Sequence, residues 1–421
     1  MADRSRNPDK SDLSKRPTGA LRDADSHDRV ALVLAGGGIP GWMYEIGVLT
    51  ALDEFFKDGF STNHFDMYVG TSAGAALASL LANGVSPREI YDAIIADDPD
   101  SLYNFSRPKI YGFGTGETWP MIRKVLAASG RMVAEVVEAI VKRDRKMSML
   151  DLAYTVQESL PSGIFTLKPL EKTLRQAFDA APMTNDFRDL KVDLFIPAVD
   201  LDKGEYVVFG DSGWDDVPIS RAVIASSAVP VLFQPVRIND ADYIDGGIGR
   251  VANMRVAVDQ GAGLVLVVNP VVHLNNDRNQ VCLPTCYGFC RGLRDKGMSF
   301  VADQAMRVNT GMRLRNAKAQ QEALYPDVDI EIIEPDPSDT VMFTQNVVAH
   351  DTRHEVMRYG YRSTVAALLG QFERYQTIFG RRGIGVTLDH FRWRPRSSGM
   401  HVLGPNERER TGNGLPLSEA G

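Results

Sequence analysis

The sequence predicts an α/β protein in which a largely parallel sheet is covered by helices on both faces. Strand-like apolar runs alternate with helical segments between two polar ends. At the end of one such run, Ser72 stands in Gly70-Thr71-Ser72-Ala73-Gly74. The chain has 421 residues, of which 44% are hydrophobic and 24% charged, so it can bury a substantial core.

In the first half of the chain, apolar runs and small-residue segments alternate in the order strand, helix, strand, helix. These elements are expected at residues 30–35, 40–56, 65–69 and 73–82. Residues 86–160 break this rhythm because they contain helical segments and few strand candidates. We therefore expect a helical insertion or cap there.

The second half resumes the alternation of strands and helices. Strands are expected at 192–201, 205–209, near Val236, near Tyr243 and at 264–268, and helices at 219–227, 297–324 and 354–379. No internal repeat is visible in the sequence.

The two ends of the chain are polar and have little to bury. Residues 1–28 and 383–421 are expected to be disordered tails, which leaves 29–382 as the folded domain. The first 29 residues contain no apolar segment typical of a signal peptide, and no run approaches the ~18 apolar residues of a membrane span. We expect a cytoplasmic protein. The net charge of −7 argues against a nucleic-acid partner.

Two basic segments offer alternative interpretations. Apolar residues recur at helical spacing over 132–141 and are followed by a basic cluster at 142–146. This helix either packs on the domain as a cap or lies on a lipid surface. Residues 381–396 combine arginines with Phe391 and Trp393, which suits either a solvated tail or peripheral contact with an anionic membrane.

The three cysteines lie within nine residues, at Cys282, Cys286 and Cys290. This number excludes a disulfide scaffold as the architecture, and we expect three reduced thiols. A metal site would need a fourth ligand, for which His273 is the nearby histidine. No metal or other cofactor is expected.

The segment around Ser72 has the pattern of a nucleophile elbow. A sharp turn from strand to helix crowds side chains, so Gly70 and Gly74 relieve the clash on either side of the serine. Such a turn exposes the hydroxyl at the N-terminus of a helix, where the helix dipole favours a developing oxyanion. Ser72 is therefore a candidate nucleophile.

A second glycine cluster, Gly36-Gly37-Gly38, follows the first expected strand and, with Gly41, opens a helix. This spacing also fits a dinucleotide-binding fingerprint. The next strand, however, ends in the serine turn rather than in the acidic residue that would hold a ribose. Three consecutive glycines suit instead a nest of backbone N–H groups directed at an anion, and beside Ser72 that nest would be an oxyanion hole.

A serine nucleophile needs a base, and two kinds of residue could supply it. His350 and His354 could serve a conventional triad. Asp245, in Tyr243-Ile244-Asp245-Gly246-Gly247, is better placed because it follows a short strand and precedes two glycines that permit close backbone approach. An ionised aspartate within hydrogen-bond reach of the serine can act as the base.

The three motifs together resemble the patatin-like phospholipase family. Gly36-Gly37-Gly38-x-x-Gly41, Gly70-x-Ser72-x-Gly74 and Asp245-Gly246-Gly247 occur in that family's order. The resemblance implies a three-layer α/β/α fold and a Ser72–Asp245 dyad without histidine. It also implies an oxyanion hole formed by the N–H groups of Gly36, Gly37 and Gly38, and hydrolysis of phospholipids or other acyl-ester lipids at a membrane.

One residue departs from the family pattern. The family usually carries Arg or Lys immediately before the last glycine of the first motif, where this chain has Pro40. Arg250 could supply the missing cation. Because of this departure, one alternative is a protein that keeps the fold and binds acyl lipids or anions without catalysis. The other alternative is the esterase with a histidine base.

Overall fold

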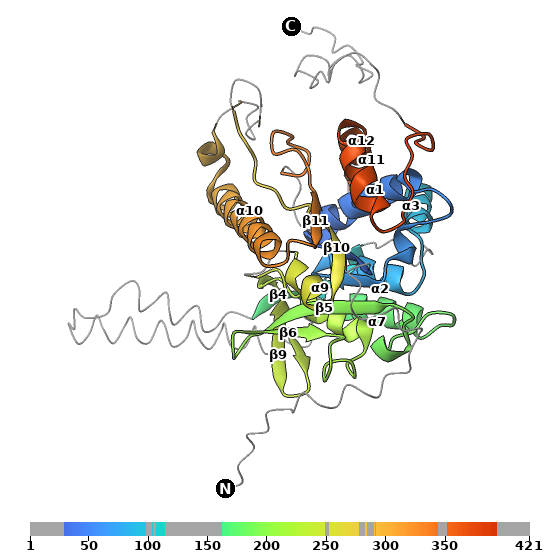
Figure 1. Ribbon diagram of the computed structural model, residues 1–421. Helices are drawn as coiled ribbons and strands as arrows, with labels where there is room; N and C mark the ends of the chain where they lie inside the picture. The colour runs from blue at the N-terminus through green and yellow to red at the C-terminus, as the bar shows by residue number, and fades with distance from the viewer. Residues whose placement is uncertain are drawn as a thin grey trace, which may run out of the picture.

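A central eight-stranded sheet forms the middle layer of the protein (Figure 1). The computed structural model describes residues 29–97, 103, 107–113, 162–248, 252–277, 283, 290, 292–343 and 352–393. In sheet order the strands are β11 (Asp329–Ile333), β10 (Ala262–Val268), β1 (Arg29–Leu34), β2 (Met67–Gly70), β5 (Asp193–Asp200), β9 (Ala241–Asp245) and β8 (Val236–Ile238), and β6 (Glu205–Phe209) also pairs with β5.

The five strands from β11 to β5 are parallel, whereas β6 and β9 pair antiparallel with β5, and β8 pairs antiparallel with β9. Leu34 at the end of β1 pairs with both Gly70 of β2 and Val268 of β10. The carboxyl ends of these three strands therefore meet at one edge of the sheet, which we call the carboxyl edge. In such α/β sheets, ligands bind beyond the carboxyl ends of the strands.

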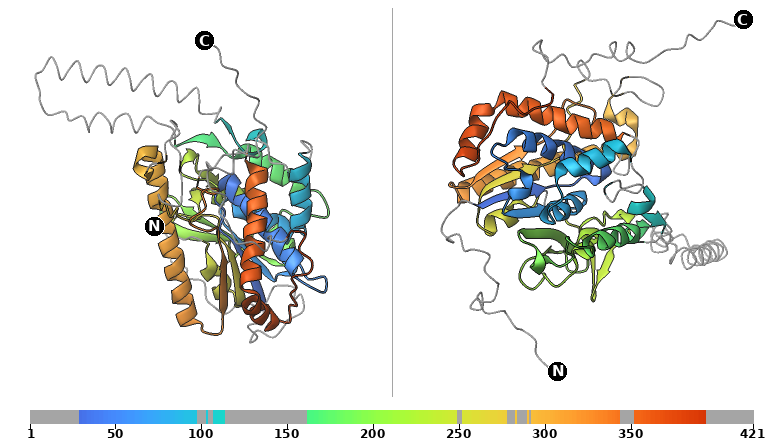
Figure 2. Two further views of the ribbon diagram at one scale, coloured as in Figure 1. Left: turned by 90° about the horizontal axis from the view of Figure 1, so that it is seen from above. Right: turned by 90° about the vertical axis from the view of Figure 1, so that its right-hand side faces the viewer.

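Helices cover both faces of the sheet (Figure 2). One face carries α1 (Gly38–Phe55), α2 (Ala73–Ala82), α3 (Pro87–Ala96), α7 (Lys168–Phe178), α8 (Ile219–Ser226), α11 (Arg353–Gly370) and α12 (Phe372–Gly380). The other face carries α9 (Met254–Asp259) and α10 (Met298–Leu324). The expected three-layer α/β/α fold is confirmed.

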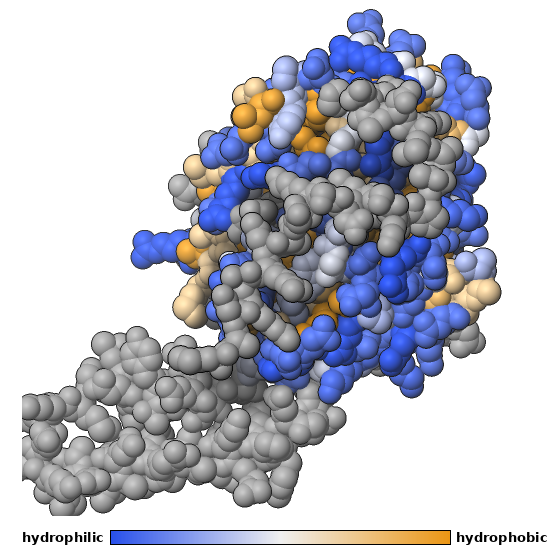
Figure 3. Space-filling model, turned by 60° about the horizontal axis from the view of Figure 1, so that its bottom comes forward, coloured by the Kyte–Doolittle hydropathy of each residue, from blue (hydrophilic) through white to orange (hydrophobic). Residues whose placement is uncertain are grey.

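Strand alternation builds these two cores. In β1, Val30, Leu32 and Leu34 belong to the cluster under α1, while Ala31 and Val33 belong to the cluster under α9 and α10. Strands that are buried on both faces require continuous apolar runs, which explains why the sequence of β1 was recognisable. The face shown in Figure 3 is mostly hydrophilic where its residues are described, with apolar side chains gathered in small patches.

A smaller three-stranded sheet lies beside the main one. It contains β3 (Gly112–Phe113), β4 (Gly163–Thr166) and β7 (Val231–Phe233), and a short helix, α4 (Arg107–Ile110), precedes it. In the part of the chain that the structure describes, the remaining regular segments are the 3-10 helices η1 (Thr62–His64), η2 (Phe187–Asp189) and η3 (Leu293–Lys296).

The expected C-terminal boundary differs from the structure. Residues 384–393, which we assigned to a disordered tail, pack on the core, and the ring of Phe391 stacks on Phe55 with centroids 6.1 Å apart. The arginines in and just before this segment form ion pairs: Arg381 and Arg382 with Asp329, and Arg392 with Glu54. The arginines in the described part of 381–396 therefore form ion pairs within the protein.

Several other expectations differ from the structure or concern residues that it does not describe. The helix expected at 354–379 is two helices, α11 and α12, which meet at Gln371. Cys290 is disulfide-bonded, so the expectation of three reduced thiols is wrong for this residue. Residues 1–28, 132–146 and 394–421 lie outside the described residues. Among the described helices, none is long and apolar enough to cross a bilayer.

Candidate active site

Ser72 occupies a strained turn between β2 and α2. Its φ of 56° and ψ of −129° lie in a region that non-glycine residues rarely adopt. The flanking glycines permit this turn: a Cβ at Gly74 would lie 2.6 Å from the carbonyl oxygen of Leu34, and one at Gly70 would lie 2.6 Å from that of Gly74. The turn at Ser72 therefore has the backbone geometry that the expected nucleophile elbow requires. Ser72 is buried, with an exposed fraction of 8%.

The glycine loop packs directly against this turn. Gly36, Gly37 and Gly38 have φ values of 78°, 109° and 67°, all in the region that favours glycine. A Cβ at Gly36 would lie 2.4 Å from the carbonyl oxygen of Thr71. Gly37 caps α1 and Pro40 lies in the first turn of that helix, where the missing N–H costs no hydrogen bond.

One N–H of the glycine loop is already used by the protein. The Gly36 N–H donates to Oε1 of Glu45, at 2.8 Å. Glu45 is fully buried in α1, and burial raises the pKa of its carboxyl well above the ordinary range. Among the described residues, the N–H groups of Gly37 and Gly38 make no hydrogen bond. The first of the three expected donors is thus engaged and the other two are available.

Asp245 ends β9, where the backbone holds it in place. Its N–H donates to the carbonyl oxygen of Ala228 at 3.0 Å, and its Oδ1 accepts the N–H of Gly247 at 2.7 Å. A Cβ at Gly246 would lie 2.1 Å from the carbonyl oxygen of Pro197, so the turn after Asp245 requires glycine. The two glycines that the sequence singled out therefore have distinct tasks.

Burial raises the pKa of Asp245 to about 6, against the opposing effects of the Ser72 hydroxyl and the Gly247 N–H. Asp245 is 5% exposed. Its Oδ2 is buried and makes no hydrogen bond. The Ser72 hydroxyl therefore lies near the carboxylate and lowers its pKa without a completed hydrogen bond to Oδ2. Catalytic hydrogen bonds of this kind are often long before substrate binds.

Ser226, the last residue of α8, connects the turn at Ser72 with the loop that follows Asp245. Its Oγ accepts the N–H of Ser72 at 3.0 Å and donates to the carbonyl oxygen of Pro197 at 2.6 Å. Its carbonyl oxygen accepts the N–H of Gly246 at 3.3 Å. On the other side of the turn, Asn253 Nδ2 donates to Thr71 Oγ1 at 3.0 Å. These contacts fix the serine turn relative to the aspartate loop.

The other candidates from the sequence are placed elsewhere. The ring of His354 hydrogen-bonds the carbonyl oxygen of Ile94, 2.9 Å away, at the junction of α11 and α3. His350 and Arg250 lie outside the described residues. Sequence reasoning missed Glu45 and Asn253. Glu45 had one available signal, since it is the sole charged residue in the otherwise apolar start of α1.

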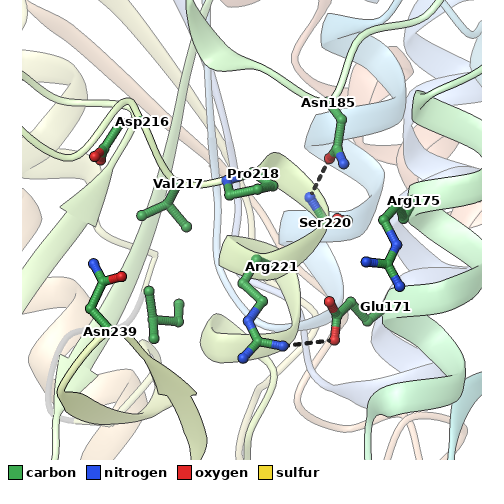
Figure 4. Close-up of a pocket in the computed structure, with 10 residues that line it drawn as sticks. Glu171, Arg175, Asn185, Asp216, Val217, Pro218, Ser220, Arg221 and Asn239 are labelled. Carbon is green, nitrogen blue, oxygen red and sulfur yellow. Dashed lines mark hydrogen bonds and ion pairs between the residues drawn. The ribbon is translucent and has the colours of Figure 1, made fainter.

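A cavity of about 430 Å³ lies at the opposite end of α8 from Ser226 (Figure 4). Ser220 and Ser226 are six residues apart, or about 9 Å along a helix. Four charged side chains, Glu171, Arg175, Asp216 and Arg221, line this cavity, and Arg221 bonds Glu171 at 3.0 Å. Asn185 Oδ1 accepts the Ser220 N–H at 2.8 Å. An acyl chain needs an apolar lining, so this cavity does not suit the acyl group of a lipid.

A model of the family described as patatin-like phospholipase matches residues 32–258, which is more than half of the chain. The chain belongs to the patatin-like phospholipase family. The matched residues of this patatin domain run from β1 to α9 and include Ser72 and Asp245.

Curated relatives of the patatin domain share about a quarter of its residues. The chain is 22% identical over 217 residues to "Probable lipid hydrolase 463L" of Invertebrate iridescent virus 6, which covers 52% of this chain and 59% of that protein. It is 26% identical over 232 residues to the "cGAMP-activated phospholipase" of Vibrio cholerae, covering 52% and 53%. The chain therefore spans between half and three fifths of the length of these relatives.

A solved structure similar to this chain is VipD from Legionella pneumophila. The identity is 17% and the TM-score 0.36, over 82% of this chain and 67% of that one.

Proposed function

We propose that this protein is a serine lipid acyl hydrolase that cleaves fatty-acyl esters in the manner of a phospholipase A or lysophospholipase. Membership of the patatin-like family supports the reaction class. The observation that carries the residue assignment is the fixed juxtaposition of the strained Ser72 turn, the glycine loop and the buried Asp245.

In the proposed first half-reaction, Ser72 Oγ attacks the carbonyl carbon of the ester while its proton passes to Asp245 Oδ2. The N–H groups of Gly37 and Gly38 stabilise the tetrahedral oxyanion. We narrow the oxyanion hole to these two donors because the Gly36 N–H already bonds Glu45. Loss of one such donor typically costs about 100- to 1000-fold in rate.

Collapse of the intermediate breaks the bond to the leaving alcohol, whose oxygen takes the proton from Asp245 Oδ2. The acyl group stays on Ser72 as an ester. Water then attacks this ester, gives its proton to Asp245, and the same proton returns to Ser72 Oγ as the fatty acid leaves. Asp245 is thus base and acid in turn, and its pKa of about 6 is closer to neutral pH than that of an ordinary aspartate.

The substrate in this proposal is a phospholipid or another acyl-ester lipid, and the protein acts from the cytoplasm as a peripheral membrane enzyme. Pro40 replaces the cation usual in the family, so in this proposal backbone dipoles stabilise the oxyanion without a cation from that position. The same replacement is the reason to test a catalytically silent lipid-binding protein as the alternative outcome.

The test is labelling by a fluorophosphonate probe together with fatty-acid release from phospholipid vesicles. We expect Ser72→Ala to lose labelling, and both Ser72→Ala and Asp245→Asn to lose release by about 1000-fold or more. Ser79→Ala is the matched serine control, since the Ser79 hydroxyl in α2 donates to the Ala75 carbonyl oxygen within the same helix. Asp242→Asn, on the same strand as Asp245 and paired with Arg237, is the matched carboxylate control.

Labelling of the folded protein without release from any vesicle would keep the nucleophile and point to a different ester. Absence of labelling would contradict the proposed nucleophile and favour the lipid-binding alternative. Full activity of Asp245→Asn would contradict the dyad.

A further inference from the structure

Ser226, at the end of α8, has a hydroxyl that is fully buried and makes two hydrogen bonds. Its Oγ lies 3.0 Å from the backbone nitrogen of Ser72 and 2.6 Å from the carbonyl oxygen of Pro197. A backbone N–H can only donate a hydrogen bond, and a carbonyl oxygen can only accept one. The hydroxyl proton therefore points at Pro197, and a lone pair of the same oxygen receives the Ser72 N–H.

The Ser72 N–H depends on this hydroxyl for its hydrogen bond. On one side of it, the N–H of Thr71 bonds the Leu34 carbonyl oxygen at 3.0 Å, and on the other, the N–H of Ala75 bonds the Ser72 carbonyl oxygen at 2.9 Å. In the part of the chain that the structure describes, the Ser72 N–H reaches no backbone carbonyl, and its acceptor is Ser226 Oγ. Because Ser72 is buried, removal of the hydroxyl would leave its N–H without any partner.

This hydrogen bond is made by the strained residue of the site. Ser72 keeps a φ of 56° and a ψ of −129°, which costs conformational energy and persists only where neighbouring contacts hold it. Its carbonyl oxygen bonds within the turn that starts α2, whereas its N–H bonds a different helix, α8. The bond to Ser226 is therefore the polar contact that ties the strained backbone to the rest of the fold. Without it the turn could relax, and the Ser72 hydroxyl would leave its place near Asp245.

Through its backbone, Ser226 also holds the loop that carries the aspartate. Its carbonyl oxygen accepts the N–H of Gly246 at 3.3 Å, and two residues later the carbonyl oxygen of Ala228 accepts the N–H of Asp245 at 3.0 Å. The end of α8 thus fixes the position of the aspartate loop, while the Ser226 hydroxyl fixes the turn at Ser72. Since the hydroxyl is buried and both of its hydrogen bonds go to the backbone, it neither contacts a substrate nor transfers a proton.

We propose that Ser226 is a positioning residue that holds Ser72 in the strained conformation from which its hydroxyl attacks the ester. This inference rests on the proposed lipid acyl hydrolase function and adds a residue that acts through the dyad. Its effect passes through one hydrogen bond to the backbone of the nucleophile. Loss of this bond should therefore lower kcat and leave the KM for substrate nearly unchanged.

A displaced Ser72 should also change the ionisation of Asp245. Burial raises the pKa of Asp245 to about 6, and two neutral groups lower it, the Ser72 hydroxyl and the Gly247 N–H. When the Ser72 hydroxyl moves away, one of these lowering effects is lost and the pKa rises. The acidic limb of the pH–rate profile should then move to higher pH in Ser226→Ala. A change that only destabilises the fold does not move this limb.

The experiment compares Ser226→Ala with the wild type, using a water-soluble short-chain ester and a fluorophosphonate probe. We expect kcat and the rate of labelling to fall about 10- to 100-fold, as for a buried N–H that loses its acceptor, with KM within about twofold. Ser226→Cys retains a weaker donor and acceptor and should lie between the two proteins. Ser227→Ala is the matched control, because the Ser227 hydroxyl donates to the Val223 carbonyl oxygen in its own helix at 2.8 Å. It should keep the wild-type rates and pH profile.

A double-mutant cycle tests whether Ser226 acts through the dyad. In Asp245→Asn the base is already absent, so the alignment of Ser72 with it no longer matters. Adding Ser226→Ala to that protein should slow labelling by no more than about threefold, against the much larger effect in the wild type. Equal effects in the two backgrounds would overturn the proposal, since Ser226 would then act independently of Asp245.

Other outcomes also contradict the role of Ser226. Wild-type rates in folded Ser226→Ala would overturn it, as would a lower melting temperature with unchanged labelling of the folded fraction. A higher KM with unchanged kcat would overturn it in favour of a contact with the substrate. The same criteria apply to Ser226→Cys if the alanine protein does not fold. These results leave the proposed function standing, because the wild type is still labelled. Absence of labelling in the wild type would contradict the proposed function and this inference with it.

Discussion

At the scale of single residues, the site combines two acids whose environments differ from those of surface carboxylates. The Asp245 carboxylate accepts the Gly247 N–H through Oδ1 yet keeps Oδ2 without a partner, and burial raises its pKa to about 6. Glu45 is buried without a cation, and burial raises its pKa well above the ordinary range. In the proposed reaction the first exchanges a proton, while the second accepts the Gly36 N–H of the glycine loop.

The ionisation of Asp245 should set the pH dependence of the proposed reaction. A general base works only when it is deprotonated, so kcat/KM for a water-soluble ester should be half-maximal near pH 6 and fall about tenfold per unit below it. The measurement is a pH–rate profile between pH 4.5 and 8.5, with Asp242→Asn as a control that keeps the same profile. A rate that stays constant down to pH 4.5 would contradict Asp245 as the base.

Glu45 should matter through the hydrogen bond that it accepts rather than through its charge. Glu45→Gln retains an acceptor oxygen for the Gly36 N–H, so we expect kcat within a few-fold of the wild type. Glu45→Leu leaves that buried N–H without a partner, which costs about 1–3 kcal/mol, and we expect at least a tenfold lower kcat.

The checks on Glu45 are kcat and KM for a water-soluble ester, the rate of fluorophosphonate labelling, and thermal unfolding. A purely structural role would lower the melting temperature without slowing labelling of the folded fraction. Equal kcat in the Gln and Leu variants would show that the contact to Gly36 does not position the loop.

At the scale of elements, the site is built where loops approach each other too closely for side chains. The glycine loop before α1 lies against the turn before α2, and the turn after β9 lies against β5. Each approach occurs at the end of a strand, so the order of strands in the sheet brings together residues that are far apart in the sequence. The glycines are required by these contacts and not by turn formation alone.

Gly36→Ala should show whether the close contact, rather than the turn alone, requires glycine at this position. Its Cβ would lie 2.4 Å from the Thr71 carbonyl oxygen, so either the loop or the serine turn must move, and we expect fluorophosphonate labelling to fall at least about 100-fold. Gly204→Ala is the control, because Gly204 also has a positive φ (67°) but no atom lies within 4 Å of its Cβ position. That change should cost only the backbone strain, about 1–2 kcal/mol. Normal labelling of folded Gly36→Ala would contradict the close packing.

Most elements of the parallel core could be predicted because their sequences are shaped by burial on both faces. The strands β1 and β10 and the helix α2 lie almost where the apolar runs placed them. The strand β11 was not predicted, since it is short and carries Asp329 and Glu331, whose partners Arg381, Arg382 and Arg374 come from later segments. Pairings of this kind depend on the tertiary fold and leave no local pattern.

The candidate site, too, could be predicted from the sequence only in part. Ser72, Asp245 and the glycines could be found because their motifs impose backbone conformations that few residues adopt. The sequence did not reveal that the Gly36 N–H bonds Glu45, nor that Ser226 joins the serine turn to the aspartate loop. Both contacts use common residue types whose position becomes informative only after α1 and α8 have packed on the sheet.

At the scale of the whole molecule, the folded unit extends beyond the residues that match the family. The match ends at residue 258, yet β10 lies between β1 and β11 in the sheet. Helix α11 packs on α1 so closely that a Cβ at Gly360 would lie 2.4 Å from the Tyr44 carbonyl oxygen. A fragment ending at 258 would lose β10, one of the two strands that pair with β1, and α11, which packs on α1. We therefore expect the domain to continue through α12 and the packed residues 384–393.

The position of that end can be tested by truncation. Residues 384–393 bury Phe391 against Phe55 and pair Val386 with Phe56, whereas the originally expected boundary after Arg382 removes these contacts. We expect a chain ending at Trp393 to unfold like the full-length protein. A chain ending at Arg382 should lose about 3–5 kcal/mol of unfolding free energy, as for the removal of a large buried aromatic side chain. Urea unfolding measures the difference, and Phe391→Ala in the full-length chain should reproduce most of it. Equal stability of the two truncated chains would mean that the segment rests on the core without stabilising it, and would move the domain boundary back to residue 382.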